Sequence, residues 1–125
     1  MLREVGRVRQ RPGEAYRRWF TDERVDLVVW QDRDGALLAF QLAYDKPVAE
    51  HALSWCRESG FLHEAVDDGE RVSLRHKRAR LLVADGAVPW QRLQAILHAR
   101  GGGLDGALRA RLAALVGCGA RAARP

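Results

Sequence analysis

Apolar and polar residues alternate most clearly over residues 24–45, where two runs rich in β-branched and aromatic side chains flank Asp34-Gly35. Asp followed by Gly tolerates the positive φ angles of a type I′ turn, so the pattern predicts a β-hairpin with a two-residue loop. In that register Val29 pairs with Phe40. One face of the hairpin is then apolar enough to belong to a core, while the other mixes apolar and polar side chains and includes a tryptophan.

The two-residue period continues outside this hairpin. Alternating or aromatic runs occur at residues 15–21, 50–57 and 61–66, and further ones follow at 71–76 and 80–84. Because short turns separate consecutive runs, the chain predicts an antiparallel meander sheet of about five to six strands.

Beyond Pro89 the apolar spacing changes to that of helices. Trp90–Leu97 carries apolar residues at helical spacing after a proline suited to a first helical turn. Gly101–Gly103 is expected to end this helix as a flexible joint, and Leu104–Val116 carries a second apolar stripe. The pattern therefore predicts two C-terminal helices.

Strands first and helices last indicate an α+β fold in which the helices cover one face of the sheet. At 125 residues the chain has room for one domain, and no repeat or linker divides residues 1–125. Residues 1–12 place Val5 and Val8 among arginines, a pattern of a short edge strand or a frayed arm, and we expect the frayed arm. Residues 117–125, rich in Gly, Arg and Ala, are also expected to be frayed.

The composition, 47% hydrophobic and 30% charged, is that of a folded soluble protein. No apolar run reaches the roughly 18 residues of a membrane span, and the charged N-terminus lacks the apolar segment of a secretory signal. We therefore expect a cytoplasmic protein without a membrane partner, in which Cys56 and Cys118 are free thiols.

The net charge of +5 is unevenly distributed. Residues 1–20 carry a net +4, residues 21–70 a net −8, and residues 71–125 a net +9. An acidic middle between basic ends can attract its own flanks, a second copy of the chain or a polyanion. Nearly all the basic residues are Arg in a chain also rich in Ala, Gly and Leu, a bias that a GC-rich genome produces without any binding role.

Seven short strings stand out along the chain. They are RRWF at 17–20, DLVVW at 26–30, FQLAYDK at 40–46, LSW at 53–55, GFLH at 60–63, VDDGE at 66–70 and LVADG at 82–86. Together they resemble a set of short bacterial proteins for which no activity is known. The resemblance covers roughly residues 17–97 and implies a shared fold, and it implies no catalytic role for any residue.

Three histidines, His51, His63 and His76, are expected on strand faces that carry apolar residues. Aligned at one end of the sheet with Asp67 or Asp68, they could bind a first-row metal ion or act as a general acid and base. Their spacing matches no compact ligand motif, and a histidine on an apolar face is more often a partly buried structural residue. We therefore expect neither a metal nor a cofactor.

Other motifs are explained by local structure. The run from Asp67 to Glu70 lacks the length and alternation of a calcium loop and is expected to be a turn. Gly101–Gly103 is not a phosphate loop, because no Lys-Ser or Lys-Thr pair follows it. Cys56 and Ser54 have no recognisable partners for nucleophilic catalysis.

A basic cluster is the best candidate for nucleic-acid binding, since polyanions need several cations spread over one face. Its members are Arg71, Arg75, Lys77, Arg78 and Arg80. No signature of a nucleic-acid-binding motif accompanies it, and the acidic middle of the chain interrupts a continuous basic surface.

The second face of the hairpin predicts an interface. With only two helices to cover the sheet, this face is expected to stay partly open and to form a homodimer or bind another protein. The residues expected there are Val28, Trp30, Leu37, Ala39 and Gln41. Alternatively, the helices or the N-terminal arm cover this face and the protein is a monomer.

These patterns favour a small non-enzymatic binding or interaction protein. An arginine-mediated nucleic-acid binder is the alternative, and an enzyme or metal protein built on the histidines and aspartates is a third reading.

Overall fold

The structure is a computed structural model that describes residues 1–46, 49–66, 82–84 and 88–123. Its strands are β1 (Arg3–Glu4), β2 (Tyr16–Thr21), β3 (Asp26–Gln31), β4 (Leu37–Tyr44), β5 (His51–Cys56), β6 (Gly60–Val66) and β7 (Leu82–Ala84). The helices are α1 (Trp90–Arg100) and α2 (Gly106–Ala122), joined by the 3₁₀ turn η2 (Gly101–Gly103).

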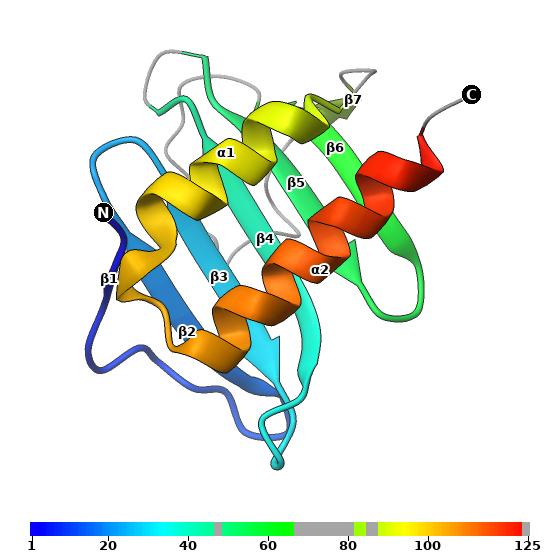
Figure 1. The fold of residues 1–125 in the computed structure, drawn as a ribbon. Helices are drawn as coiled ribbons and strands as arrows, with labels where there is room; N and C mark the ends of the chain where they lie inside the picture. Colours follow the sequence, from blue (N-terminus) through cyan, green and yellow to red (C-terminus); the bar gives the residue numbers. More distant parts are fainter. Residues whose placement is uncertain (47–48, 67–81, 85–87, 124–125) are drawn as a thin grey trace.

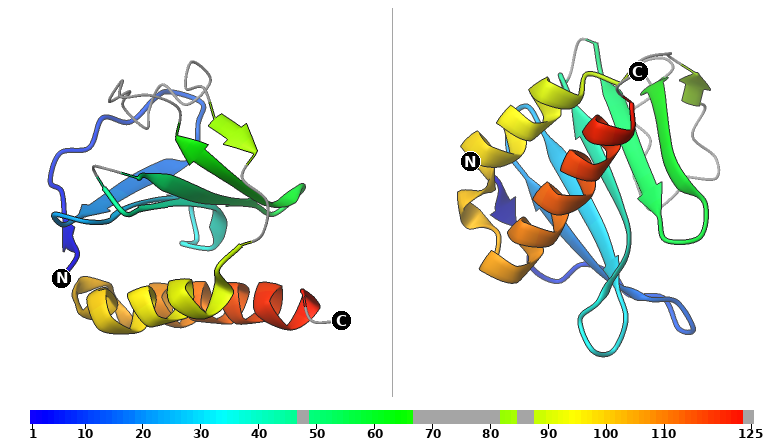
Figure 2. Two further views of the ribbon diagram at one scale, coloured as in Figure 1. Left: turned by 90° about the horizontal axis from the view of Figure 1, so that it is seen from above. Right: turned by 45° about the vertical axis from the view of Figure 1, so that its right-hand side comes forward.

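The molecule has two layers, a sheet and a helix pair that lies across one of its faces (Figures 1 and 2). The strands pair in chain order from β1 to β7, and every pair is antiparallel. This confirms the predicted α+β fold of an antiparallel meander followed by two helices. Within the described residues, neither helix combines the length and apolar character needed to cross a bilayer.

The core lies between the sheet and the helices. Alternate residues of the central strands point into it, and each helix contributes one apolar stripe. Its members include Phe20, Leu27, Phe40, Leu42, Leu53 and Trp55 of the sheet, and Leu93, Leu97, Leu108, Leu112 and Val116 of the helices.

The loop of the central hairpin differs from the prediction. The Asp32 N–H donates to the Ala36 carbonyl (2.9 Å), and the Gly35 N–H donates to the Asp32 carbonyl (3.0 Å). The loop therefore has three residues, of which Gly35 alone adopts a positive φ, 86°. This is a three-residue hairpin loop with glycine at the left-handed position, rather than the predicted two-residue turn.

A β-bulge restores the predicted register farther along the hairpin. Val29 faces Phe40 as predicted, whereas the pairing shifts by one residue next to the loop, where Gln31 faces Leu37. Because a bulge reverses the alternation of faces, Leu37 points into the helix-covered core and is only 5% exposed. The prediction that Leu37 lies on the second face is wrong for this reason.

The N-terminus is ordered rather than frayed. Leu2 is fully buried in the core, and its N–H donates to the Arg100 carbonyl at the end of α1 (3.0 Å). Arg3 and Glu4 pair with β2. Burying one leucine contributes about 1.5–3 kcal/mol, which offsets part of the entropy lost in ordering this arm, and the backbone hydrogen bonds of Leu2 and β1 add to it.

The glycines near the helices mark close contacts rather than flexibility. A Cβ at Gly103 would lie 2.1 Å from the Leu2 carbonyl oxygen, so the turn between the helices is fixed against the N-terminal strand. Gly117 and Gly119 are buried within α2, which continues to Ala122 instead of ending near Val116 as predicted.

Candidate functional site

Two of the three predicted histidines meet at one end of the sheet. Strands β4, β5 and β6 bring Tyr44, His51 and His63 side by side, and their rings stack with centroids 5.7–6.0 Å apart. The Tyr44 hydroxyl and His63 Nε2 share a hydrogen bond of 2.5 Å. His51 Nδ1 lies 2.7 Å from the Ala49 carbonyl oxygen. We call these three rings the histidine cluster.

Arg92 closes the histidine cluster from the side of α1. Its guanidinium lies over the Tyr44 ring, 5.5 Å from the centroid, and donates hydrogen bonds to both Asp45 carboxylate oxygens. These bonds lower the pKa of Asp45 and raise the pKa of Arg92. Asp45 itself has a φ of 62°, a conformation that aspartate tolerates better than most residues. The pair therefore ties the first turn of α1 to the end of β4.

Burial limits the chemistry of the histidine cluster. Tyr44 is 2% exposed and His63 is 8% exposed, while His51 is half-buried. Among the described residues, no group of three or more His, Cys, Asp or Glu side chains is placed to hold a metal ion. Among the described residues, the contacts of the histidine cluster include ring stacking across β4, β5 and β6 and the hydrogen bond between Tyr44 and His63.

Several predicted site residues lie outside the described part of the chain. They include His76, Asp67 and Asp68, the expected partners of the histidine cluster. They also include the whole candidate nucleic-acid cluster, Arg71, Arg75, Lys77, Arg78 and Arg80.

The residues of the predicted interface differ in exposure. Val28 and Gln41 are 2% and 1% exposed, and Trp30 and Ala39 are half-buried. The partial exposure of Trp30 and Ala39 is therefore narrower than the predicted patch, and the use of this face as an interface stays a prediction.

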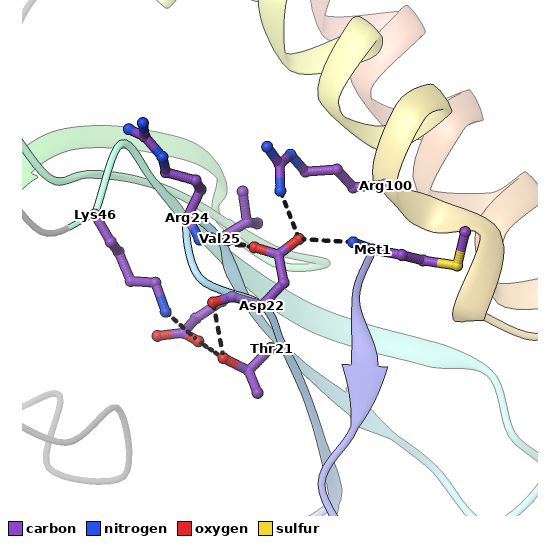
Figure 3. A network of polar contacts seen from close by, with 8 residues as sticks. Met1, Thr21, Asp22, Arg24, Val25, Lys46 and Arg100 are labelled. Carbon is purple, nitrogen blue, oxygen red and sulfur yellow. Dashed lines mark hydrogen bonds and ion pairs between the residues drawn. The ribbon is translucent and has the colours of Figure 1, made fainter.

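A second polar cluster is centred on the buried carboxylate of Asp22 (Figure 3). This carboxylate accepts hydrogen bonds from the N–H groups of Arg24 and Val25 and from the Arg100 guanidinium, all at 2.8 Å. The Met1 amino group lies 3.5 Å away. Burial opposes the charge of Asp22, but these donors outweigh it and hold its pKa at about 2. The cluster joins three parts of the fold and is occupied by its own side chains.

An open groove lies between the loop end of the β3–β4 hairpin and the start of α2. Its volume is about 420 Å³. We call it the hairpin–helix groove. Its apolar lining comes from Ala36, Leu37, Ala107 and Leu108, and its polar lining from Gln31, Arg57, Asp105 and Arg111. Leu37 and Leu108 belong to the core, so the groove opens directly onto it.

Arg57 and Arg111 give the groove its positive charge. Arg57 follows β5, and Arg111 lies in the second turn of α2. Both side chains belong to exposed residues, and within the described part of the chain neither forms an ion pair. By contrast, Arg92 and Arg100 are each held by a carboxylate. Arg57 Nη2 donates one hydrogen bond to the Leu37 carbonyl (3.5 Å), and both groove guanidiniums keep further donors available for a ligand.

Asp105 offsets only part of this charge. Its carboxylate lies 3.0 Å from the Arg18 guanidinium, which also donates two hydrogen bonds of 2.9 Å to Glu4. Counting Arg57 and Arg111 with these three residues leaves a net charge of +1 beside the groove.

Sequence patterns did not single out this groove. Arg57 follows a strand and Arg111 lies in a helix, far apart in the chain, and no local pattern relates them. The one available signal is that Arg111 stands three residues after Leu108, which places it beside the buried stripe of α2.

No protein-family model, no curated protein and no solved structure matches the chain. The proposals that follow therefore depend on the geometry of the described residues.

Proposed function

We propose that this chain is a small non-enzymatic binding protein and that its ligand is an organic anion with an apolar part, seated in the hairpin–helix groove. The observation that carries the proposal is the presence in one groove of an apolar lining and two guanidiniums, Arg57 and Arg111, that form no ion pair among the described residues.

The charge of the ligand follows from the two arginines. A guanidinium presents a planar set of donors that matches a carboxylate or a phosphate, and such charged hydrogen bonds are stronger than neutral ones. Arg57 and Arg111 come from different elements, so an anion between them would bridge the sheet and α2. The net charge of the chain, +5, further favours the approach of anions.

The apolar part of the ligand follows from the remaining lining. Leu37 and Leu108 are nearly buried, and Ala36 and Ala107 leave room above them. The volume of about 420 Å³ falls within the range of roughly 300–1,000 Å³ typical of small-molecule sites. A simple inorganic ion would leave this apolar surface in water.

The test is a titration followed by NMR, with hexanoate and benzoate as ligands and hexanamide and benzamide as neutral controls of the same shape. We expect the acids to shift the methyl signals of Leu37 and Leu108 and the amides to have little effect. Arg57→Gln and Arg111→Gln should each weaken binding about tenfold or more, because each removes a charged hydrogen bond.

Arg33→Gln is the matched control, since Arg33 is an exposed arginine in the neighbouring hairpin loop. It should leave the affinity unchanged. Equal binding of acids and amides, or equal losses in all three variants, would contradict the proposal, as would the absence of any shift in the groove.

A further inference from the structure

Half of β2 lies at an edge of the sheet. Its other neighbour, β1, pairs only with Phe20 and Thr21, and the Val5 N–H adds one hydrogen bond to the Trp19 carbonyl (2.8 Å). The outward backbone groups of Arg17 come next along this edge. An unpaired strand edge is a template on which another extended chain can add a strand.

The side chain of Gln10 occupies this position. Its Oε1 accepts a hydrogen bond from the Arg17 N–H (2.8 Å), and its Nε2 donates to the Arg17 carbonyl (2.7 Å). A carboxamide carries the same donor and acceptor as a peptide group, so Gln10 makes both bonds that a neighbouring strand would make with Arg17. Arg17 also donates through its guanidinium to the Arg9 carbonyl (2.5 Å).

The segment that carries Gln10 is attached loosely. Residues 5–15 run along the outer side of β2 without forming a strand (Figure 1). Most of these residues are exposed, so little apolar burial holds the segment in place. Among the described residues, the side-chain hydrogen bonds of Gln10 and Arg17 attach it to β2.

We propose that residues 8–10 are a displaceable plug on the edge of β2, and that this edge is a docking site for an extended acidic peptide segment of another protein. The peptide would replace the Gln10 carboxamide with its own backbone and continue the sheet beside β1. This inference is independent of the hairpin–helix groove.

Charge complementarity favours an acidic peptide over a second copy of the chain as the partner of this edge. Residues 1–20 carry six arginines and two glutamates, so acidic side chains flanking the docked backbone would meet a basic surface. In an antiparallel pair of two β2 strands that used the same backbone groups, Arg17 would face Arg17. Like charges directly opposite one another destabilise a strand pair.

The test measures the affinity of a short, labelled peptide of alternating Glu and Val by fluorescence anisotropy. Gln10→Ala should bind it about tenfold more tightly than the wild type, because two hydrogen bonds no longer compete. The same peptide with alternate backbone amides methylated cannot form the ladder and should not bind. Gln91→Ala, which changes an exposed glutamine on α1, should behave as the wild type.

Two further readouts keep the test decisive. Sedimentation velocity of Gln10→Ala should show a monomer, and self-association in place of peptide binding would overturn the choice of partner. Amide hydrogen exchange in the wild type should show Arg17 protected, and fast exchange there would overturn the plug itself. Equal affinity of the wild type and Gln10→Ala for the peptide, or binding of the methylated peptide, would also overturn the proposal.

Discussion

Asp105, the residue that precedes α2, forms an ion pair with Arg18 on β2 instead of capping its own helix. The distance to the Arg18 guanidinium is 3.0 Å, and no hydrogen bond joins the Asp105 side chain to the first turn of α2. Hydrogen bonding with Glu4, followed by that with Asp105, raises the pKa of Arg18. The start of α2 is thereby attached to the edge of the sheet.

This arrangement predicts an unusual response to replacement of Asp105 by serine. Serine loses the ion pair, worth up to about 1 kcal/mol at an exposed site, and gains a cap worth about 1 kcal/mol. High salt weakens only the ion pair. Urea unfolding in 1 M NaCl should therefore find Asp105→Ser more stable than the wild type, with Asp105→Ala close to the wild type. A serine variant no more stable than the alanine variant would show that the helix end cannot accept a cap.

Gly119 predicts a steric effect at the contact between the helices. A Cβ at this position would lie 2.3 Å from the Trp90 ring, so Gly119→Ala must push α1 and α2 apart. We expect a loss of about 1–3 kcal/mol in the free energy of unfolding, although alanine is the better helix former. Gly106→Ala, where a Cβ meets nothing within 4 Å, is the control and should be neutral or slightly stabilising. Equal effects of the two substitutions would contradict the close packing of Trp90.

Protonation of Asp22 at low pH should lower the free energy of unfolding. Its pKa is about 2 in the folded chain, against an ordinary value of 3.8. The resulting stabilisation, about 2 kcal/mol, is complete above about pH 4 and is lost as the pH falls through 2. Unfolding free energies measured between pH 2 and pH 5 should therefore depend less on pH in Asp22→Asn than in the wild type. Asp34→Asn, at an exposed loop position, should keep the wild-type slope.

Removal of the Tyr44 hydroxyl from the histidine cluster should lower the free energy of unfolding. Tyr44→Phe keeps the stacked ring but leaves His63 Nε2 without the Tyr44 hydrogen bond inside the protein. We expect a loss of about 1–2 kcal/mol in the free energy of unfolding. Tyr16→Phe removes a hydroxyl from a residue that is 55% exposed and should have little effect. Thermal unfolding of both variants gives the comparison, and equal melting temperatures would contradict a stabilising Tyr44–His63 bond.

Strand alternation and helical spacing were sufficient to predict an antiparallel meander followed by two helices, because both depend on local periodicity. They also placed His51 beside Leu53 and Trp55 on the core face. They did not predict an ordered β1, and the strand expected at residues 71–76 lies outside the described residues. The error at Leu37 arose where a bulge interrupts the period, which no alternation rule can locate. Leu2 was missed because its burial depends on α1 and η2, which follow it by nearly the whole chain.

The hairpin–helix groove and the Gln10 plug were beyond sequence reasoning for a different reason. Arg57 and Arg111 line one groove, and Gln10 bonds to the Arg17 backbone, only after the loops have been placed. The residue types were visible in the sequence, but the position of the two arginines beside an apolar groove, and the match of the Gln10 carboxamide to a backbone group, depend on the folded geometry.

The hydrogen bond from Leu2 to Arg100 has a consequence for the order of folding. Every described strand pairing joins neighbours along the chain, so the sheet can grow one hairpin at a time, and hairpins form within microseconds. The Leu2 contact instead spans nearly the whole chain and requires that α1 has already docked. In pulse-labelling during refolding, we expect the Leu2 amide to become protected from exchange after the amides of β3 and β4. Protection of this one amide would then report when the N-terminal segment docks against α1.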